Sequence, residues 1–447
     1  MMITVYTLEQ LDEFLVQADS APTDDVRRNA WASLKVDHGM FGDFPEQLVV
    51  MDPYSPDYAR KVGEFMRFLH GGDYKLADEG FDHDLSPMLK VGFPHSSRSP
   101  TTVGCYLISY GFVIRAMNLP VPSKILEIGC GTGALSIHLA RMGYDLTAVD
   151  VNCNFTNHVA KFCEGSPGKV TTIASDMNTL DLPPEYDAVL FYESFHHSYD
   201  HPATIVKAIQ FLKPGGILVL AAEPVLPAQR DILPYPWGPR LDGETLHAIR
   251  RFGWMELGFT ESYLFDLLLR NGLACRRISS NETHWADLII SRRVPRLVAG
   301  ETHDCTLGAS GLLMLATGWS ESEMWGTWSR GPVAKILIDL SDVAFAKGAT
   351  IEFDTIPFLP YSLAMQRVQV SVNDCMIAEW LFPQGEMGQN CKAVSRTARI
   401  GAKDFGPEGR VVLEFAIEKP ISPQEVGLSD DTRKLGFAIT QFTAHPY

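Results

Sequence analysis

The sequence predicts an α/β protein in which a parallel sheet covered by helices lies between a helical N-terminal region and a C-terminal antiparallel β-sandwich. Three observations lead to this prediction. Strand-like and helix-like segments alternate over residues 121–294, a pattern that produces a parallel sheet covered on both faces. Residues 1–120 show mainly helical spacing of apolar side chains. Residues 297–447 consist of short alternating segments separated by turns.

The composition indicates a large globular protein and argues against nucleic acid as a partner. The chain has 447 residues, of which 46% are hydrophobic and 21% charged, so two or three domains are expected. Its formal net charge is −16, and no run of Lys or Arg is long enough to follow a phosphate backbone. Nucleic acid is therefore not expected as a substrate.

Neither a membrane span nor a secretory leader is expected. The apolar runs are far shorter than the roughly 18 residues that suggest a membrane helix. The first residues lack a basic region followed by an apolar stretch. The eight cysteines are scattered without a Cys-x-x-Cys pair, which is typical of reduced thiols. A cytoplasmic location is the resulting expectation.

The N-terminal region is expected to contain three helices, at residues 8–18, 56–70 and 101–117. Ser55 is a good N-cap for the second helix, and Pro56 suits its first position. The third helix carries apolar residues on one face, which would pack against the domain that follows. Between the first two helices, the chain is expected to be irregular.

The following domain is expected to begin with a strand at 124–128 and a helix at 134–142. Another helix is expected at 260–270. Further strands are expected at 145–149, 169–174, 187–192, 216–222, 273–279 and 285–291.

The strongest local motif is Lys124-Ile-Leu-Glu-Ile-Gly-Cys-Gly-Thr-Gly133. Its apolar residues suit a buried strand, and its three glycines allow a sharp turn where side chains would block a ligand. The helix that follows would direct its free N–H groups at this ligand. Gly129, Gly131 and Ala134 also fit the dinucleotide fingerprint, so an NAD(P)-dependent oxidoreductase of sugars is the alternative.

The pattern Glu127-x-Gly129-x-Gly131-x-Gly133 resembles motif I of the class I S-adenosylmethionine-dependent methyltransferases. The acid inside the motif and the position of the third glycine favour this family over the dinucleotide binders. The resemblance implies a Rossmann-like, seven-stranded domain over 121–294, closed by an antiparallel pair at 273–279 and 285–291. It also implies S-adenosylmethionine as the cofactor, with Glu127 near the methionine amine.

Other residues resemble the cofactor contacts of this family. Asp150 ends the second strand, where a carboxylate can accept from both ribose hydroxyls. Asp176 and Met177 follow the third strand, where an acid would bind the adenine amino group and an apolar side chain would cover the ring. Asp176 could instead cap a turn. The expected cofactor-binding residues are Glu127, Gly129, Gly131, Gly133, Asp150, Asp176 and Met177.

The fourth strand ends in Glu193-Ser-Phe-His-His197, where the acceptor binds in the methyltransferases that this sequence resembles. Methyl transfer requires alignment of the acceptor and, for a hydroxyl, removal of a proton. A histidine titrates near neutral pH and suits this task. His196, His197 and Glu193 are therefore the expected catalytic residues, with surface or capping positions as the alternative for each histidine. His201 is expected only at a helix start.

Four residues are expected to contact the acceptor. Glu223 ends the fifth strand on the same rim as the cofactor residues. Residues 225–258 are expected to form a long loop of the kind that often covers a site. In this loop Trp237, Arg240 and Asp242 would suit a sugar, although a self-packed loop is the alternative. No metal site is predicted; a divalent ion held by Glu193, Glu223 and a histidine is the open alternative.

The C-terminal region adds a second resemblance. The stretches Gly318-Trp-Ser-x-x-Glu-x-Trp-Gly-Thr-Trp-Ser329 and 422–433 are similar to sandwich modules appended to enzymes of bacterial surface-polysaccharide assembly. Trp319, Trp325 and Trp328 are expected either to stack on sugar rings or to fill the core of the sandwich.

The sequence thus predicts an O-methyltransferase acting on a saccharide or glycan precursor. Besides the oxidoreductase, a second alternative is a glycan-binding or scaffold protein with a vestigial methyltransferase core. The oligomeric state is not predicted.

Overall fold

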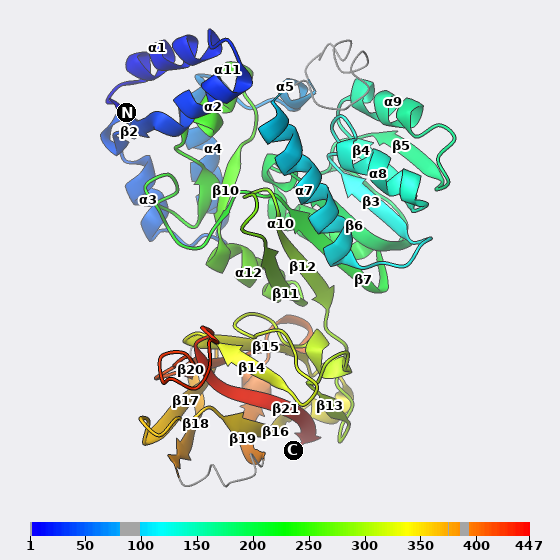
Figure 1. Ribbon diagram of the computed structural model, residues 1–447, viewed down its shortest axis with the longest axis vertical. Coiled ribbons are helices and arrows are strands. Elements are labelled where there is room, and N and C mark those ends of the chain that lie inside the picture. The colour runs from blue at the N-terminus through cyan, green and yellow to red at the C-terminus, as the bar shows by residue number, and fades with distance from the viewer. Residues whose placement is uncertain (1, 81–98, 374, 385–392) are drawn as a thin grey trace. The chain divides into compact units, whose positions relative to one another are not determined.

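The computed structural model describes residues 2–80, 99–373, 375–384 and 393–447, which divide into two compact units (Figure 1). Unit 1 comprises Met1–Leu267 and Arg277–Ile290, and unit 2 comprises Leu268–Arg276 and Ser291–Tyr447. The sequence predicted three regions with limits near 120 and 294. In the structure the N-terminal helices and the parallel sheet lie in the same compact unit.

A seven-stranded sheet, in the order β11-β12-β7-β6-β3-β4-β5, follows the chain between the two terminal regions. The neighbours among its five strands from β3 to β7 are all parallel. This mixed α/β arrangement is Rossmann-like, as predicted. The strands are β3 (Lys124–Ile128), β4 (Asp145–Asp150), β5 (Val170–Ala174), β6 (Tyr186–Tyr192), β7 (Leu212–Ala221), β11 (Leu273–Ser279) and β12 (Asp287–Arg293).

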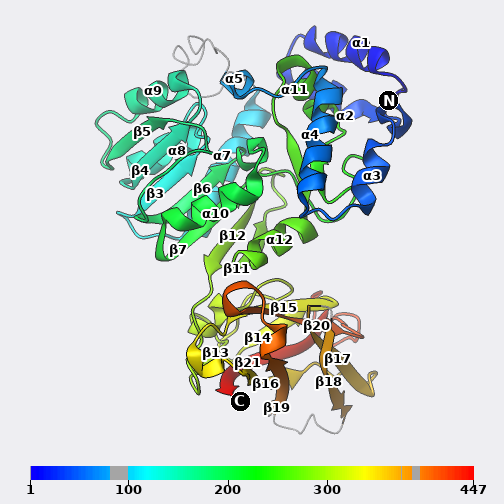
Figure 2. The ribbon, with the colours of Figure 1, turned by 180° about the vertical axis from the view of Figure 1, so that it is seen from behind.

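Helices cover both faces of this sheet. In Figure 1, α7 and α8 lie in front of the strands, and in Figure 2 α10 lies in front of them from the opposite side. Tyr110 and Val113 of α7, Leu139 of α8 and Val159 of α9 share one apolar core with the sheet. The helices are α7 (Pro100–Met117), α8 (Ala134–Met142), α9 (Cys153–Phe162), α10 (His201–Phe211) and α12 (Glu261–Arg270).

The N-terminal part of unit 1 is more regular than the sequence indicated. The segment predicted to be irregular contains α2, β2 and α3, and the Thr23 side chain caps α2 by accepting from the Val26 N–H. Ser55 caps α4 as expected, accepting from the Tyr58 N–H at 3.2 Å. The elements are β1 (Ile3–Val5), α1 (Leu8–Asp19), α2 (Asp24–Ser33), β2 (Leu34–Val36), η1 (His38–Phe41), α3 (Phe44–Val50), α4 (Pro56–His70) and α5 (Leu76–Glu79).

The segment after β7 is a folded insert, so the prediction of a long loop at 225–258 was wrong. Its strands form a small sheet in the order β8-β10-β9. Trp237 pairs with Phe259 in this sheet, is only 3% exposed, and accepts a 2.7 Å hydrogen bond at its carbonyl from the Tyr58 hydroxyl of α4. The insert therefore anchors the N-terminal helices. Its elements are β8 (Val225–Leu226), β9 (Trp237–Pro239), α11 (Gly243–Phe252) and β10 (Leu257–Thr260).

Unit 2 consists mainly of two antiparallel sheets. One has the order β13-β21-β16-β19, with β14 also paired to β21, and the other has the order β15-β20-β17-β18. Phe353 of the first sheet and Phe415 of the second belong to one apolar core. The strands are β13 (Thr302–Asp304), β14 (Thr327–Arg330), β15 (Val333–Asp339), β16 (Gly348–Pro357), β17 (Met365–Val372), β18 (Cys375–Pro383), β19 (Val394–Gly401), β20 (Arg410–Ile417) and β21 (Leu435–Pro446). Short 3-10 helices are η3 (Ser310–Leu313), η4 (Val343–Phe345), η6 (Ala402–Asp404) and η7 (Pro407–Gly409).

The three tryptophans of unit 2 differ in exposure. Trp319 packs against the apolar core and donates from Nε1 to the Lys335 carbonyl at 2.7 Å. Trp325 is 38% exposed and meets the half-buried Trp328 edge to face, with 5.4 Å between ring centroids. Only the latter pair is therefore available at the surface. Within the described ranges of the chain, no helix is both long and apolar enough to cross a membrane.

Candidate active site

The glycine turn after β3 adopts a backbone that L side chains rarely tolerate. The φ angles of Gly129, Gly131 and Gly133 are +74°, +50° and +77°. A Cβ at Gly129 would overlap Ser194, and one at Gly133 would overlap Val159, whereas a Cβ at Gly131 would meet nothing within 4 Å. Gly129 and Gly133 are thus needed for packing, and Gly131 leaves an open cradle above the turn.

Asp150, at the end of β4, is fixed beside this cradle. Its Oδ2 accepts from the Gly131 N–H at 2.8 Å, and its Oδ1 accepts from the Asn152 N–H at 2.9 Å. Burial raises the pKa of Asp150 above its ordinary value, although these two backbone donors oppose the shift. The sequence of β4 thus ends in a carboxylate whose orientation is set before any ligand binds.

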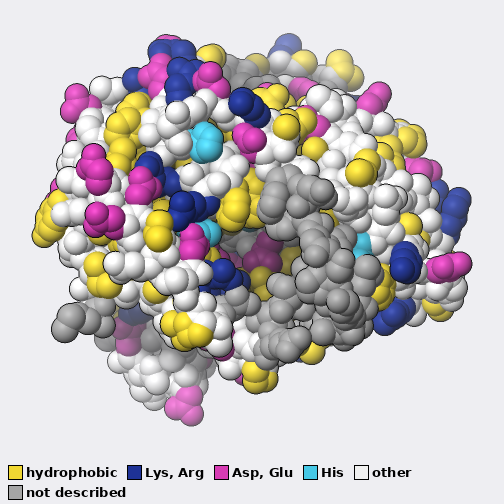
Figure 3. Space-filling view, turned by 90° about the horizontal axis from the view of Figure 1, so that it is seen from above, with side chains coloured by type: hydrophobic (Ala, Val, Ile, Leu, Met, Phe, Trp, Pro, Cys, Tyr) yellow, Lys and Arg dark blue, Asp and Glu magenta, His cyan; other side chains and the backbone are white. Residues whose placement is uncertain are grey.

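One pocket brings together residues that the sequence assigned to separate roles. Its lining includes five residues expected to bind the cofactor: Gly129, Gly131, Asp150, Asp176 and Met177. It also includes Glu193 and His197, two of the three residues expected to be catalytic. The space-filling view in Figure 3 shows a hollow in this face of the molecule with acidic side chains inside it. The carboxyl ends of the parallel strands meet here, as the fold requires.

Glu127 and Gly133 are not among the residues that line the pocket. Glu127 is 2% exposed and accepts a hydrogen bond from the Ser136 hydroxyl of α8. Burial raises the pKa of Glu127 to about 7, despite this hydrogen bond. Gly133 is the N-cap of α8. Both residues support the glycine turn, and the prediction that they contact the cofactor stays a prediction.

Asp176 caps a turn and also lies at the pocket, so its position is compatible with both roles that the sequence left open. Its Oδ1 accepts from the backbone and side-chain N–H groups of Asn178, at 2.8 and 2.9 Å, so it caps the turn after β5. It also lines the pocket together with Met177.

Glu223 organises the short turn η2 (Phe195–His197) that carries both histidines. Its Oε1 accepts from the N–H groups of Ser194 and Phe195, and its Oε2 accepts from the N–H of His196 and lies 2.7 Å from the same residue's Nδ1. Burial alone would raise the pKa of Glu223, but His196 and the backbone donors outweigh it and lower the pKa. With these four donors, Glu223 positions the turn; the predicted acceptor contact is not what its geometry favours.

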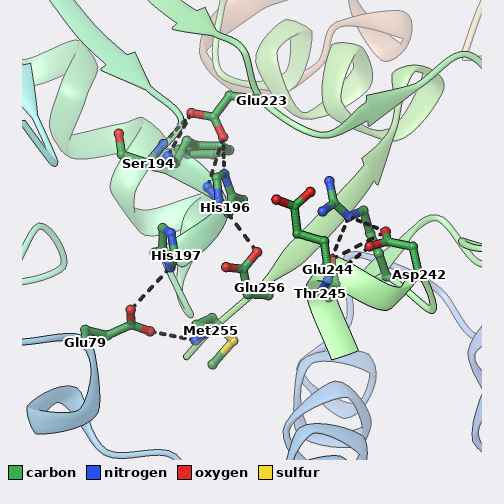
Figure 4. Close-up of polar contacts among 12 residues, drawn as sticks. Glu79, Ser194, His196, His197, Glu223, Asp242, Glu244, Thr245, Met255 and Glu256 are labelled. Atoms are coloured by element: carbon green, nitrogen blue, oxygen red, sulfur yellow. Dashed lines mark hydrogen bonds and ion pairs between the residues drawn. The ribbon is translucent and has the colours of Figure 1, made fainter. Parts of the chain in front are cut away.

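The two histidines have different surroundings (Figure 4). His196 holds Glu223 with Nδ1, and its Nε2 lies 3.7 Å from Oε2 of Glu256; it does not line the pocket. His197 does line the pocket, and its Nδ1 lies 3.2 Å from Oε2 of Glu79. The other oxygen of Glu79 accepts from the Met255 N–H at 2.6 Å. Only His197 can therefore meet a ligand in the pocket directly.

Carboxylates dominate the electrostatics around His197. Burial lowers the pKa of the ring, but Glu79, Glu256 and Glu223 outweigh burial and raise the pKa to about 9. This part of the site therefore favours positive charge.

Glu193, at the end of β6, lies in a different environment. It is a non-glycine residue at φ +49°, a conformation that costs free energy and is retained mainly at functional sites. Burial, together with the charges of Glu244 and Glu223, raises its pKa to about 8, while Tyr106 and Arg28 oppose the shift. At neutral pH Glu193 is therefore mostly protonated and can donate a hydrogen bond into the pocket.

The insert residues expected to bind a sugar are used elsewhere. Arg240 donates from Nε to Thr245 Oγ1 and pairs with Asp242 at 2.9 Å, and Asp242 caps α11 by accepting from the Thr245 N–H. Trp237 donates from Nε1 to the Pro53 carbonyl at 2.9 Å. These residues hold the insert together, as the alternative of a self-packed segment implied.

The sequence did not indicate several residues of the site. Tyr74, Glu79 and Trp254 line the pocket, and Glu256 faces His196. Glu79 ends the four-residue helix α5, and Trp254 and Glu256 follow α11. Single residues in short segments carry no periodic or spacing signal, so only the fold could reveal them.

The comparison with known families identifies the centre of this unit. Residues 125–216 match a family model described as a methyltransferase domain. The chain carries an S-adenosylmethionine-dependent methyltransferase domain. The match begins in β3 and ends in β7, so it contains the glycine turn, Asp150 and the η2 turn.

Part of the chain is similar to three named proteins. The mitochondrial ubiquinone biosynthesis O-methyltransferase of Schizosaccharomyces pombe is 32% identical over 112 residues, covering 24% of this chain and 41% of that protein. The ubiquinone biosynthesis O-methyltransferase of Rickettsia conorii is 26% identical over 98 residues, 22% of this chain and 34% of that protein. The probable S-adenosyl-L-methionine-dependent methyltransferase TehB of Haemophilus influenzae is 31% identical over 81 residues, 18% of this chain and 28% of that protein. The chain thus spans less than half the length of these relatives.

Proposed function

We propose that the protein transfers a methyl group from S-adenosylmethionine to a hydroxyl oxygen of a saccharide or glycan precursor. The observation that carries this proposal is the single pocket lined both by Gly131 and Asp150 and by Glu193 and His197. The residues expected to bind the cofactor and those expected to bind and deprotonate the acceptor thus face the same space, which supports the proposal.

The residues of the pocket fit the proposed cofactor. The open space at Gly131 is a cradle that any side chain would fill. Each oxygen of Asp150 accepts one backbone N–H, and carboxylate oxygens have two lone-pair sites each, so capacity remains for a ribose diol. Asp176 and Met177 would contact the adenine. Bound S-adenosylmethionine supplies an electrophilic methyl group.

The chain's own groups would position the acceptor and manage its proton. Protonated Glu193 would donate a hydrogen bond to the acceptor and help to align the reacting hydroxyl. The His197–Glu79 pair would receive the hydroxyl proton in its deprotonated form, since both residues line the pocket, and activity should therefore rise with pH towards the raised His197 pKa of about 9. His196 would not touch the acceptor; it would hold the η2 turn in place through the contact of its Nδ1 with Glu223.

The charge around the acceptor side supports a neutral, hydroxyl-rich acceptor. Glu79 and Glu193 line the pocket, Glu256 faces His196, and carboxyl groups are suitable partners for sugar hydroxyls. The acidic surroundings disfavour an acceptor that carries a carboxylate or phosphate next to the reacting hydroxyl.

The test is a transfer assay with methyl-labelled S-adenosylmethionine and a panel of nucleotide sugars, short glycans, phenols and carboxylic acids. We expect label on a sugar hydroxyl, and a loss of at least tenfold in kcat for the His197→Ala variant without a matching loss of cofactor affinity. Labelling of phenols alone would show that the acceptor is aromatic and that the proposed saccharide acceptor is wrong. Binding of NADH without binding of S-adenosylmethionine would instead support an oxidoreductase.

A further inference from the structure

We propose that His196, His197 and Glu256 form a binding site for one divalent transition-metal ion of the zinc type, at the edge of the pocket. One ring nitrogen of each histidine and one carboxylate oxygen of Glu256 all lie within 4.8 Å of one another. Figure 4 shows the two rings and the carboxylate of Glu256 close together, with Glu79 on the far side of His197. In the part of the chain that the structure describes, no other group of His, Cys, Asp and Glu meets this condition.

The orientation of His196 is the first argument. Both oxygens of Glu223 accept backbone N–H groups, so the 2.7 Å contact with this carboxylate places a proton on Nδ1 of His196. In the neutral ring, Nε2 then carries a lone pair, and this atom faces Oε2 of Glu256 at 3.7 Å. A contact of this length is too long for a hydrogen bond. An ion at about 2.0–2.2 Å from each atom would bridge it.

The same contact supplies the support that metal ligands usually have. A histidine ligand commonly donates its other ring N–H to a carboxylate, which fixes the ring and raises its basicity. Glu223 does this for His196, and it is itself held by the N–H groups of Ser194 and Phe195. The ring of His196 is thus oriented by a carboxylate that is itself fixed by the backbone.

His197 provides the second argument. Its Nδ1 atom is buried and lies 3.2 Å from Glu79, but the contact does not have hydrogen-bond geometry. The ring of His197 stands 4.3 Å from that of His196, measured between centroids. Glu79, Glu256 and Glu223 face the two imidazoles, so a dication that displaces the extra proton of His197 to solvent would offset the accumulated negative charge.

The ligand set indicates the kind of ion. Two imidazole nitrogens and one carboxylate oxygen suit zinc and similar transition-metal ions, whereas magnesium and calcium prefer oxygen ligands throughout. Three protein ligands leave a position open, as in catalytic zinc sites. Because His197 lines the pocket, an acceptor hydroxyl could reach that position. This last role rests on the proposed function; Glu79 would then remain as the proton acceptor.

The site differs from the metal site left open by the sequence, which combined Glu193, Glu223 and a histidine. Glu223 lies behind His196, where it orients the ring, and Glu193 is outside the cluster. Glu256 supplies the carboxylate ligand in their place.

The test is a titration of the chelator-treated, full-length protein with ZnCl2, followed by calorimetry, and with CoCl2, followed by visible absorption. We expect one ion per chain, no displacement by excess MgCl2, and a loss of affinity of at least tenfold in His196→Ala and Glu256→Gln. Glu223→Gln should lower the affinity by about 10–100-fold without touching the ion. His445→Ala removes an exposed histidine of β21 and should leave the affinity unchanged.

Two results would overturn the proposal: no binding of zinc or cobalt by the wild-type protein, or unchanged binding by the His196→Ala/Glu256→Gln double variant. Glu256→Gln nearly preserves shape, and its melting curve would show that loss of metal is not loss of fold. The titration needs neither cofactor nor acceptor. Metal binding without hydroxyl methylation would therefore contradict the proposed function alone, and methylation by a protein that binds no metal would contradict this inference alone.

Discussion

At the scale of single residues, the carboxyl groups of the site differ in charge because their surroundings differ. Glu127 has mainly a buried hydroxyl as partner, and its pKa rises to about 7. Glu193 is buried near other acids, and its pKa rises to about 8. Glu223 is equally buried, yet the donors of the η2 turn and His196 lower its pKa. One residue type thus provides a neutral hydrogen-bond donor and a fixed anion within one site.

Asp150→Ala should weaken binding of S-adenosylmethionine by about 2 kcal/mol, roughly 30-fold, through loss of charge-assisted hydrogen bonds to the ribose. Isothermal titration calorimetry measures this change directly. Asp57→Asn is the matched control, since this acid on α4 is 75% exposed and should not alter the affinity. An affinity equal to that of the wild type in Asp150→Ala would remove Asp150 from the cofactor site.

Glu193 should make the stability of the protein depend on pH. Its folded-state pKa is raised from 4.5 to about 8, so the folded protein holds this proton more tightly than the unfolded chain. Stability should therefore fall as pH rises from about 4.5 through about 8. Melting temperatures measured across this interval should fall more for the wild type than for Glu193→Gln, which cannot titrate. Parallel curves for the two proteins would mean that Glu193 is ionised in the folded state.

At the scale of elements, the site depends on how the ends of three neighbouring strands are tied together. The Ser194 hydroxyl, after β6, donates to the Ile128 carbonyl of β3 at 2.7 Å, and Glu223, after β7, accepts from the Ser194 N–H. The glycine turn and the histidine turn are therefore held in a fixed relation. A substitution where the two turns touch should lower the stability of the fold. A substitution on the side of the glycine turn that faces the pocket should lower the affinity for the ligand.

The glycines of the turn allow a direct test of this distinction. Gly129→Ala should lower the melting temperature markedly, because the new Cβ would overlap Ser194. Gly131→Ala meets no protein atom within 4 Å and should cost only on the order of 1–2 kcal/mol for its positive φ. Its main effect should be a loss of at least tenfold in cofactor affinity. Melting curves and calorimetry separate the two effects; cofactor binding by Gly131→Ala as tight as the wild type would contradict the open cradle.

At the scale of the whole molecule, the parts predicted well are those with a long, regular pattern. The structure places β3 and α8 at the predicted limits, because a buried strand, three glycines and a capped helix leave few alternatives. By contrast, α2 was missed because charged and polar residues dominate it, and the insert was missed because its strands have only two to four residues. Glu79 reaches the site from the four-residue helix α5, and Glu256 reaches it from the insert. The residues at the ends of the long parallel strands, Asp150, Glu193 and His197 among them, were therefore accessible from the sequence, whereas Glu79 and Glu256 were not.

We propose that unit 2 binds glycan through Trp325. The ring of Trp325 is 38% exposed, is held by a hydrogen bond from Nε1 to Glu323 at 2.9 Å, and meets Trp328 at its edge. A fixed, exposed aromatic face is what a sugar ring stacks on. Trp325→Ala should therefore raise KM for a polymeric acceptor several-fold and leave kcat and KM for a short acceptor unchanged.

Tyr361→Ala is the matched control, because Tyr361 is an aromatic side chain of unit 2 that is 97% exposed and lies apart in sequence from the tryptophan motif. It should leave both acceptors unaffected. Equal losses in both variants would indicate a general effect of surface aromatic groups. If Trp325→Ala binds and methylates the polymer as the wild type does while its melting temperature falls, Trp325 serves the packing of unit 2. The carbohydrate would then be recognised by unit 1 alone, through the carboxyl groups around His197.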